Sequence, residues 1–267
     1  ETAYDEIIER HPGSYAAYLS KMWKADRMFN SKADQLAAER LFQEIAGSTN
    51  TPLQLRHRAQ MMSGRAAVAR QGYDDARKSF SALLDNPNAN GSVKVEATFA
   101  LGDLILIELG APASDALAKL TQSTNAFYSI IQSEPVSEIA ARAWGRIGDS
   151  CRLMASEQPG FHVHALQAYR KSLTVSVKVP SNIKNHALMG MAYTIEQFGL
   201  KDGGNGESLL EALNHLLAVF YGRHLDSGQK QNPYWRAQSG LAALRLLEKL
   251  KQYDQWLKIC DELERSF

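Results

Sequence analysis

Two histidines separated by one residue form the most suggestive chemical pair in the sequence. His162 and His164 carry imidazoles, which bind zinc in many proteins. Two residues apart on a helix, however, the two side chains point to different faces. No cysteine or carboxylate nearby completes a tetrahedral set. We therefore predict structural or solvated histidines and no metal site.

A glycine-rich segment at residues 203–208 precedes a predicted helix, whose amino end could hold an anion. No strand precedes it and no Lys-Ser/Thr pair follows, so the phosphate-loop signature is missing and we predict a hairpin turn. Serine, histidine and aspartate occur, but none lies in a nucleophile elbow. No pair of carboxylates is placed for acid–base catalysis. We expect a protein that is not an enzyme, with no catalytic residues and no cofactor.

Composition narrows the class of protein further. The chain has 267 residues, of which 45% are hydrophobic and 22% charged, as in an ordinary folded protein. A net charge of +1 gives no field that would favour nucleic acid. No run of 18 apolar residues occurs, so we expect no membrane insertion. The two cysteines, Cys151 and Cys260, lie in apolar helical stretches and are interpreted as buried free thiols.

The elements that must position any site are helices. Apolar residues recur at three- and four-residue spacing in almost every segment, and no segment alternates with period two. Several Pro-containing clusters fit helix starts. Thr51 with Gln54 fits a capping box with Pro52 at the first helical position, and Asn232 before Pro233 follows the same logic.

An internal repeat is clearest at residues 59–87. Gly64 and Ala76 are small where two helices would press together, and Tyr73 and Phe80 are large where the space between them must be filled. This helix–turn–helix unit resembles the tetratricopeptide repeat. The number of residues from the small residue of one second helix to the small residue of the next first helix is nearly constant, as stacked units require. These pairs are Ala38 and Gly64, Ala76 and Gly102, Ala165 and Gly190, and Ala212 and Gly240.

The resemblance implies an all-α fold, a right-handed α-solenoid of about five to six helical hairpins in a single domain over residues 1–267. The expected repeats are 14–47, 52–88, 92–135, 137–179, 182–225 and 232–267, with 1–12 as the tail of a truncated repeat. The spacing within hairpins varies, so we predict insertions in the turns inside the hairpins, the longest at 110–122, 156–162 and 199–208. We interpret the chain as a piece of a longer protein.

The resemblance also implies a binding groove, because the first helix of each such hairpin lines the inner face of the stack. We count six and three residues before, and one and four residues after, the small residues Gly64, Gly102, Gly148 and Gly190. These positions carry a mixture of arginine, acidic and apolar side chains, which could hold a peptide and bind a carboxylate. The alternative is that these charges only solvate the inner face. The predicted groove residues are Arg58, Met61, Arg65, Glu96, Phe99, Asp103, Arg142, Asp149, Arg152 and Lys184.

A longer phrase, at residues 4–17, narrows the resemblance. It is similar to a Tyr-x-x-Ile-Ile-x-x-x-Pro-x-Ser phrase of bacterial cell-envelope tetratricopeptide proteins, such as outer-membrane assembly lipoproteins and the Tol–Pal coordinator, and residues 127–140 echo it. This implies a scaffold that binds a protein or peptide at the periplasmic side or outer membrane. A cytoplasmic scaffold is the alternative location. The alternative functions are a structural module that self-associates through apolar ends, and a carbohydrate-active or carbohydrate-binding helical toroid.

Overall fold

The described part of the chain has only helices as regular structure. The computed structural model describes residues 2–31, 34–108, 115–176, 178–201 and 206–265, and within them the chain forms thirteen α-helices and no strand. The predicted all-α class is therefore confirmed. None of the helices in these ranges carries an apolar stretch long enough to cross a lipid bilayer.

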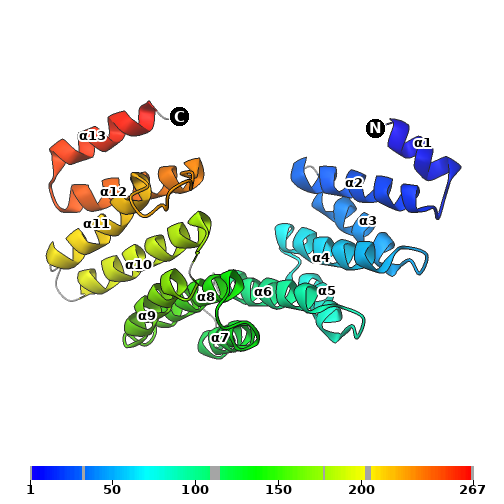
Figure 1. Cartoon of the computed structure of the whole chain (residues 1–267), viewed down its shortest axis with the longest axis horizontal. Helices are drawn as coiled ribbons and strands as arrows, with labels where there is room; N and C mark the ends of the chain where they lie inside the picture. Colours follow the sequence, from blue (N-terminus) through cyan, green and yellow to red (C-terminus); the bar gives the residue numbers. More distant parts are fainter. Residues whose placement is uncertain (1, 32–33, 109–114, 177, 202–205, 266–267) are drawn as a thin grey trace. The chain divides into compact units, whose positions relative to one another are not determined.

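The chain divides into two compact units, residues Glu1–Ala113 and Ser114–Phe267 (Figure 1). Within each unit every helix packs against the next one in sequence. The first unit contains α1 (Thr2–Arg10), α2 (Tyr15–Ser31), α3 (Gln35–Gly47), α4 (Leu53–Ala69), α5 (Tyr73–Asp85) and α6 (Gly91–Glu108). The second contains α7 (Ala116–Ser133), α8 (Glu138–Met154), α9 (Phe161–Thr174), α10 (Ser181–Lys201), α11 (Gly206–Phe220), α12 (Pro233–Lys249) and α13 (Tyr253–Glu264).

Five of the expected hairpins coincide with neighbouring helix pairs: α2–α3, α4–α5, α8–α9, α10–α11 and α12–α13. The pair expected at 92–135 corresponds to α6 and α7, which belong to different units. A single domain over the whole chain stays a prediction. Two expected insertions differ from the structure: α7 already begins at Ala116, and α10 continues to Lys201, so part of the extra length is helix rather than turn. Residues 109–114 and 202–205 lie outside the described part of the chain.

Local capping explains several helix starts. Asn232 accepts a hydrogen bond from the backbone N–H of Tyr234 at 2.9 Å with Pro233 in the first turn, as predicted. The predicted capping box at Thr51 is wrong, because α4 begins at Leu53 and Pro52 occupies the cap position. Thr51 is instead buried just before the helix.

Two hairpin turns far apart in sequence have the same backbone geometry. The turn after α4 places Gln71 at φ 65°, and the turn after α12 places Lys251 at φ 57°. In each, the next N–H bonds back to the fifth preceding carbonyl: Gly72 to Ala67 at 2.8 Å, and Gln252 to Leu247 at 2.9 Å. This is the Schellman arrangement, which ends one helix so that an antiparallel one can begin.

Glycines on α4, α8, α10 and α12 let aromatic side chains approach the helix backbone. A Cβ added to Gly64 would lie 2.3 Å from Phe80 of α5, and one on Gly240 would lie 2.9 Å from Phe220 of α11. Tyr169 of α9 meets two glycines, Gly148 of α8 and Gly190 of α10, at 2.5 and 2.3 Å. Real Cβ atoms do not approach so closely, so these positions require glycine. The role predicted for Gly64 and Phe80 is confirmed.

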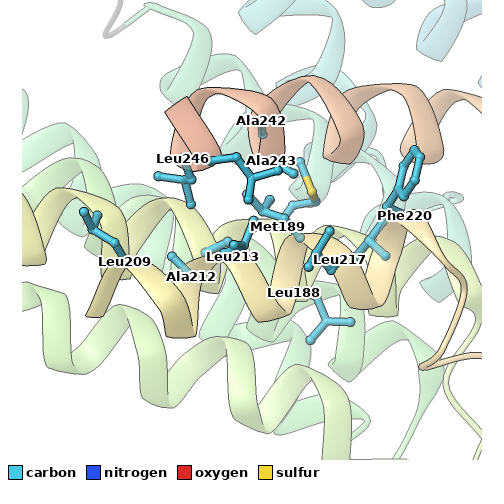
Figure 2. Close-up of a cluster of buried hydrophobic side chains, with 14 of the residues drawn as sticks. Leu188, Met189, Leu209, Ala212, Leu213, Leu217, Phe220, Ala242, Ala243 and Leu246 are labelled. Carbon is cyan, nitrogen blue, oxygen red and sulfur yellow. The ribbon is translucent and has the colours of Figure 1, made fainter. Parts of the chain in front are cut away.

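Apolar clusters fill the space between consecutive helices in each unit. One such cluster, in the second unit, joins α10, α11 and α12, with Leu213 and Leu246 almost fully buried (Figure 2). Ile259 of α13 closes the same cluster, with Trp256 and Leu263 packed beside it. The apolar stripe of α13 therefore faces α12, and the exposed apolar side chains of this helix are Tyr253 and Leu257.

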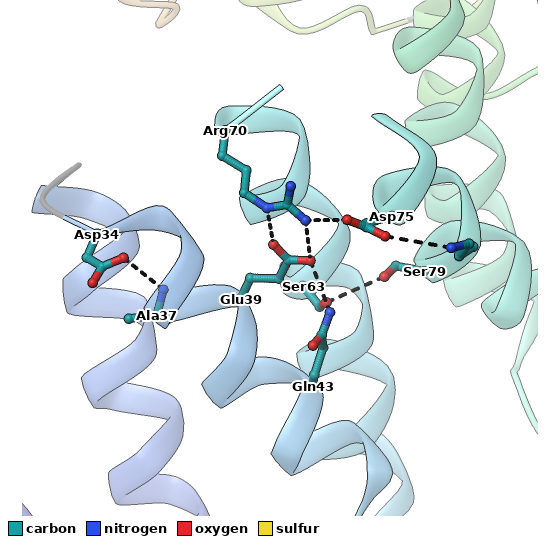
Figure 3. A network of polar contacts seen from close by, with 9 residues as sticks. Asp34, Ala37, Glu39, Gln43, Ser63, Arg70, Asp75 and Ser79 are labelled. Atoms are coloured by element: carbon teal, nitrogen blue, oxygen red, sulfur yellow. Dashed lines mark hydrogen bonds and ion pairs between the residues drawn. The ribbon is translucent and has the colours of Figure 1, made fainter. Parts of the chain in front are cut away.

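An ion-pair network around the buried Glu39 connects three helices of the first unit (Figure 3). Glu39 of α3 has a side chain only 2% exposed, and Arg70, just after α4, donates to both of its carboxylate oxygens, with Nη2 to Oε1 at 3.0 Å. Arg70 also donates to Asp75 of α5. The hydrogen bonds to Glu39 and Asp75 raise the pKa of the Arg70 guanidinium, so its charge is permanent. Each partner thus offsets the cost of burying the other.

Substituting Gly64→Ala should lower the free energy of unfolding by about 1–3 kcal/mol, because the new methyl group collides with the Phe80 ring. Chemical denaturation followed by circular dichroism measures the change. The control is Gly91→Ala at the start of α6, where nothing lies within 4 Å, and it should be neutral or slightly stabilising. Equal destabilisation by both substitutions would show that the close approach is unimportant.

Substituting Arg70→Met should destabilise the protein by about 3 kcal/mol, since the buried Glu39 carboxylate loses its partner. The double variant Arg70→Met with Glu39→Gln should recover a large part of that loss in the same denaturation assay. Lys78→Ala, at an 80% exposed side chain near Asp75, is the control and should cost less than about 0.5 kcal/mol. No recovery in the double variant would contradict the pairing.

Candidate functional site

The first helices of the hairpins share a surface in each unit. Besides their neighbours in sequence, α4 packs against α6 in the first unit, and α10 packs against both α8 and α12 in the second. We call α2, α4 and α6 the first-helix face of the first unit, and α8, α10 and α12 the first-helix face of the second. The predicted groove residues lie on these helices.

Ion pairs cross the first-helix face of the first unit. Arg58 of α4 donates to Asp26 of α2 at 2.8 Å, and Arg65 of α4 lies 3.7 Å from Glu96 of α6. The Arg58 and Arg65 side chains are 62% and 50% exposed. Burial raises the pKa of Asp26, and the neighbouring Arg58 charge opposes that rise. Three of the predicted groove residues therefore lie at the surface of this face as a balanced row of charges.

Two other predicted groove residues of this unit do not reach the surface. Met61 is only 8% exposed and Phe99 only 1%, so both belong to the packed interior. Their assignment as contact residues is corrected, since a ligand could reach them only by opening the core. Asp103 of α6 is half-buried.

The first-helix face of the second unit contains a polar hollow of about 510 Å³. We define the polar hollow by its lining: Arg152 from α8, Tyr193, Glu196 and Gln197 from α10, and Gln238, Leu241, Ala242 and Arg245 from α12. Three successive first helices thus contribute side chains to one depression. A pocket of this size with a few convergent polar groups is a common form of binding site.

The electrostatics of the polar hollow are dominated by arginine. Glu196 is its one carboxylate, 12% exposed, and it pairs with Lys249 at 2.7 Å and Arg245 at 3.6 Å. The Arg152 side chain interacts with the Tyr169 hydroxyl, and its buried Nε has no hydrogen-bond partner in the described part of the chain. Burial raises the pKa of Tyr193, so its hydroxyl stays protonated and can donate. The cationic groups outnumber the carboxylate, so the hollow favours an anionic group.

Asp149 occupies a structural network beneath this face. Its carboxylate accepts from the Tyr169 hydroxyl at 2.8 Å, from His186 Nε2 at 2.9 Å and from Arg146 at 3.1 Å. These partners come from α8, α9 and α10. The predicted groove residue Asp149 is therefore engaged in joining three helices. Gly145 makes room for His186, whose Nδ1 would lie 2.9 Å from an added Cβ.

The remaining predicted groove residues have separate surroundings. Arg142 is half-buried on α8, and Lys184 of α10 pairs with Asp226 at 2.6 Å. Of the predicted set in the second unit, the polar hollow includes Arg152 alone.

Sequence reasoning missed the other polar residues of the hollow. The count from the small residue stops four residues after it, whereas Glu196 lies six residues beyond Gly190 on the longer α10. The unusual length of the apolar periodicity here was the signal that could have located it.

The histidine pair and the two cysteines singled out in the sequence differ in how far they are buried. His162 is buried and lies edge-on to Phe198 at 5.6 Å, whereas His164 is exposed, so the two point to different faces as predicted. Cys151 and Cys260 are both free thiols, the first buried and the second half-buried. Within the described residues no group of three metal-binding side chains converges.

Comparison with known proteins gives no match at the level of sequence: no family model fits the chain, and no curated protein is significantly similar to it.

The Asp149 network should make stability depend on pH in the acid range. Burial by itself would raise the pKa of Asp149, but His186, Arg146 and Tyr169 lower it to about 2 from the ordinary 3.8. The unfolded chain then binds the proton more tightly, so the stabilisation is present above about pH 4 and is lost as pH falls towards about 2.

We expect Asp149→Asn to lower the free energy of unfolding by about 2 kcal/mol at pH 7, and the deficit to shrink as the pH is lowered to about 2. Urea denaturation across this range measures it. Asp261→Asn, at an exposed position of α13, should change stability by less than about 0.5 kcal/mol. A deficit that stays constant with pH would rule out the assigned pKa.

Proposed function

We propose that this protein is a non-catalytic interaction scaffold of the tetratricopeptide-repeat type, arranged as a right-handed α-solenoid. It binds an acidic segment of a partner protein on the first-helix face. The observation that carries the proposal is the polar hollow, to which three successive first helices contribute two arginines and one glutamate already paired with cations. The repeated Schellman turn and the glycine–aromatic contacts support the repeat type.

The chemistry of the hollow suits a carboxylate from an extended peptide or a helix. Arginine donates in a planar fork that matches a carboxylate, and a charge-assisted hydrogen bond is stronger than a neutral one. Gln197 and Gln238 can bond to a peptide backbone, and the exposed Leu241 offers an apolar contact. The motif similarity at residues 4–17 leads us to propose the bacterial envelope as its location, with the cytoplasm as the alternative.

A self-association role is the second proposal. Tyr234 and Leu241 of α12 and Tyr253 and Leu257 of α13 are all more than half exposed. Apolar side chains gathered on the last two helices could join copies or flanking repeats. Light scattering that shows the mass of a monomer over a wide concentration range would remove this alternative.

The scaffold proposal predicts selective loss of binding when the hollow loses its charge. Peptides selected from a displayed random library on the intact protein should be rich in Asp and Glu. Their affinity, measured by fluorescence polarisation, should fall by about tenfold or more in the double variant Arg152→Gln/Arg245→Gln, since charged hydrogen bonds are worth about 1.5–3 kcal/mol each.

The matched control removes two exposed charges from second helices, Arg170→Gln on α9 and Lys258→Gln on α13. It should change affinity by less than about twofold at physiological salt, because screening weakens distant surface charges. If both double variants lose affinity equally, binding depends on overall charge and the polar hollow is not the site.

A further inference from the structure

The second unit contains another cavity, on the side of α8 covered by α7 and α9. It has a volume of about 350 Å³, within the range of small-molecule sites. We call it the apolar pocket; its floor is α8 and its walls are α7 and α9. None of the residues lining it belongs to the polar hollow, so the inference does not rest on the proposed function.

Aromatic and aliphatic side chains make up the interior of the apolar pocket. Tyr128 of α7 meets the Trp144 ring edge-on, with centroids 5.4 Å apart. Phe161 of α9 lines the other side, and Ile147 and Met154 form the floor. These groups offer ring faces and a polarisable sulfur, which pack well against an aromatic or branched aliphatic group.

The thiol of Cys151 keeps the floor uncharged. It is buried among these side chains, and burial raises its pKa to about 11. At neutral pH the group is therefore a thiol, which behaves as a small apolar surface. The floor of the pocket offers no charge to an anion or a cation.

The rim, in contrast, is cationic on one side only. Lys171 of α9 holds its Nζ 4.2 Å from the centroid of the Trp144 ring, and no carboxylate in the described ranges pairs with it. Gln167 and His164 precede it on the same face of α9, one and two turns back respectively, and both line the pocket. On the α7 side, the Thr124 hydroxyl is already donated to the Leu120 carbonyl at 2.9 Å.

We propose that the apolar pocket binds a small amphipathic anion. Its aromatic or branched aliphatic group lies over Ile147 and Met154, and its carboxylate lies at the rim beside Lys171. The polarity of the site carries this assignment: an uncharged interior bordered by one exposed lysine complements a molecule with an apolar body and a single anionic end.

Isothermal titration with 2-naphthoate and its neutral analogue 2-naphthamide tests the proposal on the whole chain. The acid should bind about fivefold more tightly than the amide, as one exposed charge pair allows. Lys171→Gln should reduce binding of the acid to the level of the amide, and leave the amide unchanged within about twofold. Equal binding of acid and amide to the unmodified protein would overturn the proposal in favour of a neutral apolar site.

The pocket itself is tested by filling it. Thr124→Phe should weaken both ligands by about tenfold or more, because the ring occupies the cavity. Thr174→Phe is the matched control: Thr174 is exposed on α9, its hydroxyl bonds to the backbone in the same way, and it does not line the pocket. Circular dichroism confirms that each variant is folded.

Two further results would overturn the proposal: binding that persists in Thr124→Phe, or no binding of either ligand at about millimolar concentration. The Arg152→Gln/Arg245→Gln variant should bind 2-naphthoate normally, so failure at the apolar pocket and failure at the polar hollow are distinguishable.

Discussion

The contact between a glycine of a first helix and an aromatic ring of a second helix sets the geometry of both units. The ring lies where a side chain would otherwise stand, so the two helices come closer than Cβ atoms would permit. Phe80, Tyr169 and Phe220 fill these places and are almost completely buried. Because the ring fixes which side of the first helix faces inward, it also determines which residues remain for the surface.

Helix positions and interhelical contacts were largely predictable from the sequence, and the exposed faces were not. Gly64 and Phe80 were identified from residue size and spacing alone, because small and large residues recur in phase. The same spacing placed Met61 and Phe99 on an inner surface, yet both are buried. A first helix is covered by neighbours on several sides, so apolar residues surround much of its circumference and periodicity cannot distinguish the exposed strip. This is a property of stacked helices, where neighbours on both sides cover each element.

The site was only partly predictable for a related reason. Arg152 was found by counting from Gly148, whereas Glu196 and Arg245 lie farther along their helices than the rule extends. Their convergence depends on how α10 and α12 pack, which no local pattern encodes. Asp149 shows the converse: the count placed it on the first helix, but Tyr169 and His186 reach it from neighbouring helices and engage its carboxylate. Which acidic residue binds a ligand and which binds the protein itself is decided by tertiary neighbours.

The two kinds of charged cluster differ in what they leave unsatisfied. Arg70 neutralises the buried Glu39, and the pairs that cross α2, α4 and α6 balance one another. In the polar hollow the single carboxylate is shared by two cations, and Arg152 adds a further positive charge. A balanced cluster stabilises the fold, whereas an unbalanced one retains affinity for an external anion.

Tyr169 has a consequence for how this architecture can change during evolution. One ring fits against Gly148 of its own hairpin and against Gly190 of the next, and its hydroxyl bonds to the same aspartate that His186 of α10 holds. A hairpin in this unit is therefore not a self-contained module. Duplicating, deleting or recombining α8–α9 alone would leave a ring without its second glycine, so the smallest segment that could be exchanged intact runs from α8 through α10. The unit that can be exchanged intact is therefore the junction between two hairpins and not a single hairpin.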